Sequence, residues 1–291
     1  MVCERRLGPF GVGGPTAETV LDGGSVPPGG TLAGEVRLRG GGADVEIEEV
    51  TLELVAGVAG NDAPFARFRV GGGFPLAAGE RRAVPFAVAL PWETPVTELH
   101  GQPLGVPLGV RTGLGAAGAS DTGGLDPLAV APLPAQDAVL RALGRLGFGF
   151  LSASLEPGRL AGTGQQLPFR QEFGLIPPEH YAEGVREVGL TFLAGTGGVE
   201  VVLGTGDAPD RHAVGHDSVG RTDWTAEVDA WVRGLLERHR SGLGLGAALA
   251  AGVVGGLVAA EVMEDLGDAP EAGPAAEGGG RHGRRRGGGA D

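Results

Sequence analysis

Lysine is absent from this chain of 291 residues, and all 23 of its basic residues are arginines. A Walker-type phosphate loop requires a lysine, so the glycine-rich stretches GVGG, RGGGAD and VGGGF cannot be nucleotide-binding loops of that kind. The net charge is −13, whereas a protein that binds nucleic acid through its phosphates needs a positive face. We therefore expect no nucleic-acid partner.

Cysteine and the aromatic residues are also scarce. Cys3 is the single cysteine, which excludes an internal disulfide framework and fits a reducing compartment. The N-terminal stretch MVCERRLGPFGVGG contains no apolar run long enough for a secretory signal, so we expect a cytoplasmic protein. Glycine is abundant, at 58 residues, and we interpret that excess as a coding bias that weakens every glycine motif.

Alternating apolar residues dominate the first 130 residues. TLAGEVRLRG places Leu32, Val36 and Leu38 on one face, as in a half-buried antiparallel strand. In ADVEIEEVTLELVAGV the alternation changes phase at Glu48-Glu49, which predicts a β-bulge or a sharp bend. Pro85 lacks an N–H group, so the strand RRAVPFAVAL should lie at a sheet edge or carry a bulge. These short strands predict an N-terminal β-sandwich over residues 1–131.

The second half of the chain predicts a similar domain with a helix at each end. PAQDAVLRALGR lies between prolines and a glycine and predicts a connecting helix over residues 132–146. LPFRQEFGL, VREVGLTFL and VEVVLG alternate like strands, with Gln171 a polar exception, and predict a smaller β-sandwich within residues 147–240. The fold class is therefore all-β, with two tandem immunoglobulin-like β-sandwich domains.

An amphipathic pattern predicts a closing helix over residues 223–239. Asp223 is its expected N-cap, and Trp224 and Trp231 lie on its apolar face. Two tryptophans on one face need a large apolar surface to cover. That surface is either the second sandwich or a partner protein, so both tryptophans are candidates for interaction.

Residues 241–291 form a glycine- and alanine-rich segment and a tail of low complexity. Leu243–Ala260 carries no charge, and small residues recur in it every four positions. This segment is compatible with a flexible linker, with a helix that self-associates through its small residues, or with membrane insertion. The rest of the tail is predicted to be disordered.

No motif predicts catalysis. GHDSVG, at 215–220, does not fit the G-x-S-x-G spacing of a nucleophile elbow. His212 and His216 have the i, i+4 spacing of two metal ligands on a helix, but Gly206, Pro209 and Gly215 argue for a loop there. These histidines are weak metal candidates only, and we expect a non-catalytic scaffold with no cofactor.

The stretch PWETPVTELHG follows the strand that contains Pro85. Two prolines bracket Trp92 and Glu93, which makes the stretch a turn that ends the strand, with Trp92 at the end of the sandwich. Trp92 and Glu93 are nevertheless the first residues that we would test as part of a partner surface.

Several blocks taken in order resemble one family. They are GVGGPTAETVLDGGSVPPGGTLAGEVRLRGG, LPWETPVTELHG, LGVRTGLGAAGASDTGGLDPLAV, LPAQDAVLRALGRLGF, LPFRQEF and DWTAEVDAW. Over about residues 1–240 the chain resembles the bacterial sporulation-control family typified by the stage-zero sporulation M protein, which is similar to arrestin.

The resemblance implies two tandem arrestin-like β-sandwiches. It also implies a non-enzymatic regulator of sporulation and cell-cycle control that acts through contacts with other proteins. The alternative is a membrane-associated or self-assembling protein driven by Leu243–Ala260.

Overall fold

The structure is a computed structural model. The chain divides into two compact units, Met1–Gly242 and Leu243–Asp291. The backbone is described for residues 13–116, 119–182, 184–205 and 209–252, and the side chains of these residues except 119–121 and 242–252. The rest of the predicted disordered tail therefore lies outside the described residues, as do all the side chains on which the Leu243–Ala260 alternatives depend.

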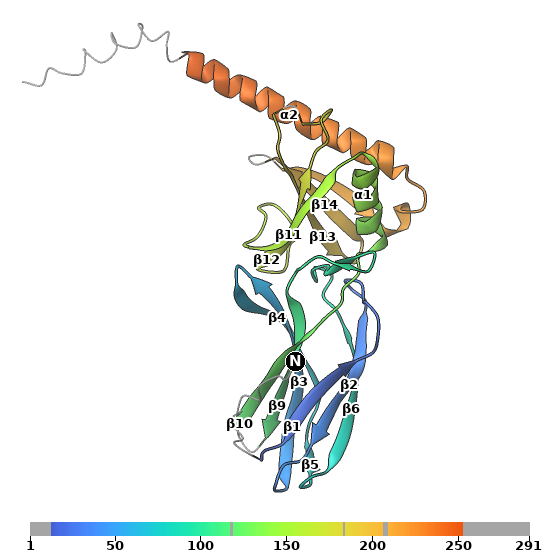
Figure 1. The fold of residues 1–291 in the computed structure, drawn as a ribbon, viewed down its shortest axis with the longest axis vertical. Helices are drawn as coiled ribbons and strands as arrows, with labels where there is room; N and C mark the ends of the chain where they lie inside the picture. Colours follow the sequence, from blue (N-terminus) through green and yellow to red (C-terminus); the bar gives the residue numbers. More distant parts are fainter. Residues whose placement is uncertain (1–12, 117–118, 183, 206–208, 253–291) are drawn as a thin grey trace, which may run out of the picture. The chain divides into compact units, whose positions relative to one another are not determined.

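The N-terminal domain is a sandwich of two antiparallel sheets (Figure 1). Its smaller sheet has the order β1-β2-β6, and its larger sheet has the order β10-β9-β3-β4, with β5 also paired to β3. A short hairpin, β7-β8, follows β6. The strands are β1 Thr16–Leu21, β2 Thr31–Arg39, β3 Val45–Val58, β4 Asn61–Gly71, β5 Phe74–Leu76, β6 Arg81–Ala89, β7 Glu98–Leu99, β8 Gln102–Pro103, β9 Leu108–Ala116 and β10 Ala119–Pro127.

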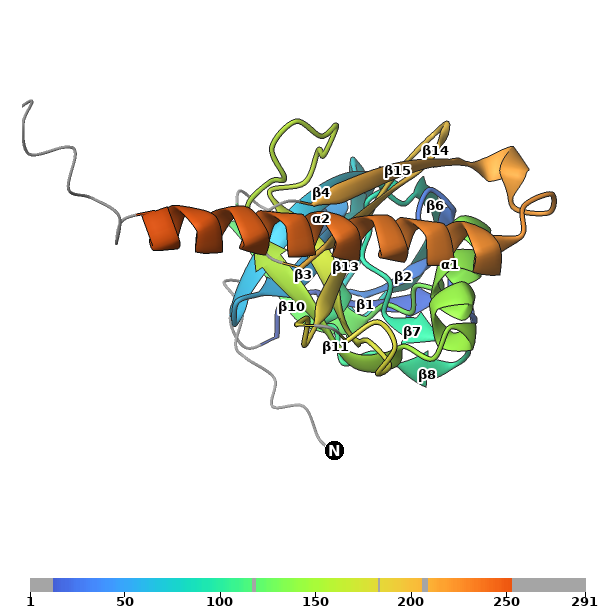
Figure 2. The same ribbon diagram turned by 90° about the horizontal axis from the view of Figure 1, so that it is seen from above.

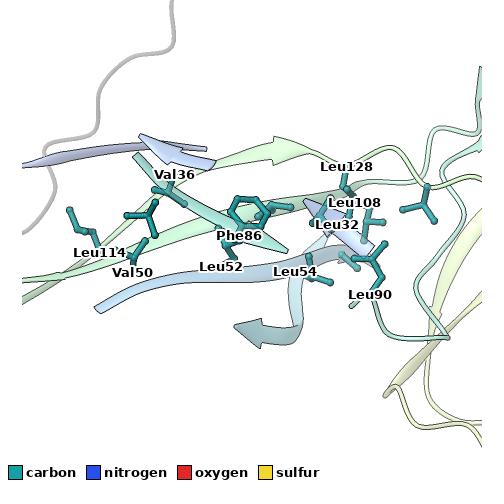
Figure 3. Packing of buried hydrophobic residues seen from close by; sticks show 14 of the residues in the cluster. Leu32, Val36, Val50, Leu52, Leu54, Phe86, Leu90, Leu108, Leu114 and Leu128 are labelled. Atoms are coloured by element: carbon teal, nitrogen blue, oxygen red, sulfur yellow. The ribbon is translucent and has the colours of Figure 1, made fainter. Parts of the chain in front are cut away.

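Alternation along these strands fills the space between the two sheets. Leu32 and Phe86 from the smaller sheet meet Leu52 and Leu54 of β3 in one cluster of buried side chains (Figure 3). Two local predictions are confirmed. The pairing of β3 with β9 shifts register between Ile47 and Glu49, at the doubled glutamate, and the strand that contains Pro85 lies at a sheet edge.

The C-terminal domain has one antiparallel sheet with the order β11-β12-β13-β14-β15. Its strands are β11 Gly149–Pro157, β12 Phe169–Ile176, β13 Val188–Gly195, β14 Gly198–Gly204 and β15 Asp210–Gly215. The helices are α1 Pro134–Arg145, the 3-10 turn η1 His216–Ser218 and α2 Trp224–Gly252. Figures 1 and 2 show α1 beside the first turns of α2.

The all-β class with antiparallel sheets is confirmed, but the second layer of this domain differs from the predicted sandwich. In the described part of the chain, side chains of α1 and α2 form one buried cluster with those of β12, β13 and β14. Alternation in a strand requires only that one face be covered, and helices cover this face as well as a second sheet would. The prediction of a loop around His212 and His216 is also wrong in part, because His212 lies in the edge strand β15.

The long helix begins where the sequence predicts. The Asp223 carboxylate accepts hydrogen bonds from the N–H groups of Thr225 and Ala226, at 3.1 and 3.2 Å, which confirms Asp223 as the N-cap. The helix then continues past the predicted end at residue 239 to Gly252. None of the helices in the described residues is long and apolar enough to cross a membrane.

Candidate functional site

The polar stretch after β6 joins the two domains. We call residues 91–97 the junction segment. Within its own domain it is a tight turn, because the Thr94 hydroxyl and backbone N–H both donate to the Pro91 carbonyl, at 2.7 and 3.1 Å. The predicted turn at the end of the edge strand is therefore present, and its outward-facing groups contact the other domain.

Glu93 bonds the junction segment to the loop between β11 and β12. Its carboxylate accepts the backbone N–H of Gln166, at 2.7 and 2.9 Å from the two oxygens, and that of Leu167, at 2.8 Å. Hydrogen bonds to an ionised group are roughly twice as strong as neutral ones. Glu93 therefore serves as an internal connection between the domains, although the sequence marked it as a candidate for a partner surface.

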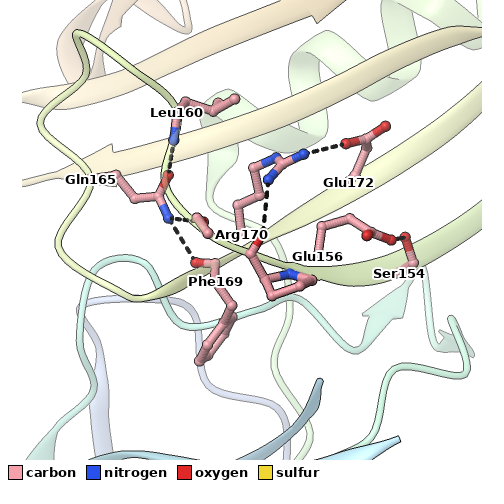
Figure 4. A network of polar contacts seen from close by, with 9 residues as sticks. Ser154, Glu156, Leu160, Gln165, Phe169, Arg170 and Glu172 are labelled. Atoms are coloured by element: carbon pink, nitrogen blue, oxygen red, sulfur yellow. Dashed lines mark hydrogen bonds and ion pairs between the residues drawn. The ribbon is translucent and has the colours of Figure 1, made fainter. Parts of the chain in front are cut away.

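A buried glutamine shapes the loop that Glu93 binds (Figure 4). Gln165 is 6% exposed, and its Oε1 accepts the N–H of Leu160 at 3.0 Å. Its Nε2 lies 2.9 Å from both the Leu167 and the Phe169 carbonyl oxygens. Because one side chain satisfies several backbone groups, the loop has a defined shape and presents its N–H groups to Glu93.

Gln171 makes a second connection, to Val96. The Val96 N–H donates to Gln171 Oε1 at 2.8 Å, and Gln171 Nε2 donates to the Val96 carbonyl at 2.7 Å. The amide thus satisfies both backbone groups of one residue, as a neighbouring strand would. The sequence showed Gln171 as a polar exception in an alternating strand. That exception was the signal in the sequence that Gln171 has a special role, but Val96, its partner, lies 75 residues away in the chain.

Trp92 lies between the two domains. Its indole stacks on the His216 ring with the centroids 5.3 Å apart, and it packs against the buried cluster of the C-terminal domain. On the other side a Cβ at Gly29 would lie 2.6 Å from the ring, and Gly29 has φ +73°. Only glycine fits there without displacing Trp92.

The two candidate metal-binding histidines have separate partners. His216 Nε2 hydrogen-bonds to the Gly195 carbonyl at 2.8 Å, while His212 in β15 lies 2.9 Å from the Asp210 carboxylate and stacks on Trp231. Among the described residues, no group of three or more His, Cys, Asp or Glu side chains is placed to hold a metal ion.

The two tryptophans of α2 face the sheet. Trp231 is 8% exposed and donates to Glu227 at 3.0 Å, and half-buried Trp224 donates to the Val219 carbonyl at 2.9 Å. Both belong to or pack against the buried cluster of this domain. Of the two alternatives, docking on the second domain or binding a partner protein, the structure shows docking, which leaves Trp231 little surface for a partner.

An ionic cluster holds α2 to the chain before β13. Arg233 donates to both oxygens of Asp229, at 3.0 and 2.9 Å, and the Tyr181 hydroxyl donates to the same carboxylate. The Arg233 guanidinium, helped by Tyr181, holds the pKa of Asp229 below its usual value. Burial first, and then the bond to Asp229, raises the pKa of Tyr181.

The domains also share apolar packing. Leu155, Leu167 and Phe169 come from the C-terminal domain, yet they belong to the buried cluster of the N-terminal sandwich. The Phe169 ring meets the Phe65 ring edge-on, with centroids 5.6 Å apart. The junction segment therefore lies beside a continuous core, so its polar bonds connect domains that already pack together.

A hollow of about 480 Å³ opens beside Glu93. Small and apolar residues form most of its lining, among them Gly195, Gly198, Leu193 and Val214. This shape and chemistry suit an apolar side chain from another molecule better than an ion.

Three comparisons place the chain among known proteins. A family model described as "SpoOM protein" matches residues 3–208. The "Sporulation-control protein spo0M" of Bacillus subtilis (strain 168) is 30% identical over 202 residues, which is 66% of this chain and 76% of that protein. The crystal structure of Spo0M from Bacillus subtilis superposes with a TM-score of 0.65 at 25% identity and covers 78% of this chain and 99% of that one.

Proposed function

Since the chain belongs to the Spo0M family of sporulation-control proteins, we propose that it acts as a non-enzymatic, arrestin-like scaffold. It binds other proteins in the cytoplasm and so regulates sporulation and the cell cycle. The binding surface is carried by two domains that are held together as one body.

The junction carries this proposal. Glu93 and Gln171 are polar residues on separate domains, and each is used for backbone groups of the other domain. A catalytic carboxylate must stay available to substrate, whereas the Glu93 carboxylate is already hydrogen-bonded within the protein, as is the Gln171 amide. What such contacts support is a fixed arrangement of two domain surfaces, and a partner that touches both surfaces would bind only while the arrangement holds.

The hollow beside Glu93 is the place where we expect a partner to insert an apolar side chain. Its lining comes mostly from β13, β14 and β15 of the C-terminal sheet, and Glu93 of the junction segment belongs to the same lining. A change at Glu93 should therefore affect both the domain arrangement and the lining of the hollow.

Proximity labelling in sporulating cells of the producing organism tests the proposal. The tagged full chain should label a reproducible set of proteins, and Glu93→Gln should reduce that set while the purified protein stays folded. Glu98→Gln is the matched control, since Glu98 is a half-buried glutamate of the nearby β7 and should label the wild-type set. The proposal would be contradicted if the folded wild-type protein labelled no more proteins than the tag alone does.

A further inference from the structure

The first half of β11 is an unusual sheet edge. β11 is the end strand of the C-terminal sheet, and its residues Gly149–Ser154 include no charged residue and no proline. Phe150 and Leu151 are 50% and 51% exposed, and the neighbouring Ile176 of β12 is 47% exposed. We call Phe150, Leu151 and Ile176 the edge patch. A row of unpaired backbone groups beside apolar side chains is a template for another strand.

The other end strands carry the features that block such pairing. As far as the structure describes these sheets, every other edge strand contains a charged residue or a proline. These residues are Glu18 in β1, Asp62, Pro64, Arg67 and Arg69 in β4, Pro75 in β5, Arg81, Arg82 and Pro85 in β6, Glu98 in β7, Pro103 in β8, Asp121, Asp126 and Pro127 in β10, and Asp210 and Arg211 in β15. Among the described edge strands, the longest run that has neither a charged residue nor a proline lies in β11 and includes Gly149–Ser154.

The local geometry limits the free edge to the first half of β11. The register with β12 shifts between Phe150 and Ser152, so a bulge at Leu151 leaves two adjacent apolar side chains exposed. Further along, Leu155 is 6% exposed and belongs to the N-terminal core, and Glu156 and Pro157 end the strand. A partner strand can therefore be only a few residues long.

We propose that the edge patch and the first half of β11 pair with the same edge of a second copy of this chain. A net charge of −13 makes two copies repel over most surfaces, and the uncharged edge lets them meet without opposing like charges. Two antiparallel copies of one edge are related by a twofold axis, so the surface complements itself. Because the paired strands are short, the contact is smaller than the roughly 1,200 Å² of a standard interface, and the dimer is weak and depends on concentration.

Sedimentation velocity on the full chain over a range of concentrations tests the pairing. The wild-type weight-average sedimentation coefficient should rise with concentration, and Leu151→Lys should abolish the rise by placing like charges opposite each other. Leu125→Lys is the matched control, because Leu125 is an exposed leucine of the edge strand β10 and should behave as the wild type. If Leu151→Lys still associates, the proposal is overturned. Association through residues 243–260 would give that result.

Cross-linking gives a second, independent readout. In a Cys3→Ser background, Leu151→Cys or Ser152→Cys should form disulfide-linked dimers under mild oxidation several times faster than Leu125→Cys does. Equal rates would overturn the proposal. The proposal would also be overturned if the wild-type chain stayed monomeric and Leu151→Lys no longer labelled one of the wild-type set of proteins in proximity labelling. The edge would then bind a strand of another protein. Dimerisation and partner labelling are scored separately, so either can fail alone.

Discussion

Glu93 and Gln171 serve in the junction as backbone groups serve within a sheet. Each satisfies peptide groups on the other domain, so the domains are joined by hydrogen bonds without a shared strand. The sequence identified both residues as unusual but could not show their use. Glu93 lies 73 and 74 residues from its partners, and no local pattern encodes a contact over that distance.

Asp126 is a residue whose charge opposes folding. It is partly buried in β10, and burial, with the charge of Glu18 added, raises its pKa. A carboxyl group with a folded pKa above its unfolded value favours folding below both values, and this contribution is lost as the pH rises through the folded pKa. At neutral pH the ionised group therefore destabilises the protein.

We predict that Asp126→Asn is more stable than the wild type at neutral pH, by about 0.5 kcal/mol given the screening by solvent. The advantage should shrink as the pH falls through the raised pKa toward the ordinary value for aspartate. Urea midpoints at several pH values measure it, with Glu46→Gln, an exposed glutamate of β3, as the control. A gain that is independent of pH would show that charge is not the cause.

At the scale of elements, the start of α2 shows what local sequence determines. Asp223 caps the helix through bonds to two N–H groups, within three residues of itself, so the helix start could be predicted. The strand β15 could not, because Pro209 and Gly215 at its ends favour a loop, and the strand forms only by pairing with β14. The helices that cover the C-terminal sheet could not be predicted as its second layer either, since that layer depends on packing between distant segments.

We predict that Asp223→Ala lowers the free energy of unfolding by about 1 kcal/mol, because it leaves the first turn of α2 without its acceptor. Asp223→Asn keeps a side-chain oxygen in place and should retain most of the stability. Urea denaturation followed by circular dichroism measures both variants. An Asn variant as unstable as the Ala variant would argue against capping.

At the scale of the described molecule, the sequence boundary between the domains is not a boundary of the core. Phe169 is 3% exposed and packs on Phe65 across the two domains. We predict that Phe169→Ala lowers the stability of both domains together, by about 3–5 kcal/mol, with one calorimetric transition. Phe150→Ala, at an exposed phenylalanine, should change stability far less. Two separate transitions in the Phe169 variant would contradict a common core.

That common core has a consequence for how this gene could be divided. A break within α1 would give two products, and the second would carry Leu155, Leu167 and Phe169 with nothing to cover them. Produced alone, it should aggregate. Produced alongside the first, it should be rescued, because each fragment completes the other. Natural fission of this gene would be tolerated only where both pieces are expressed together.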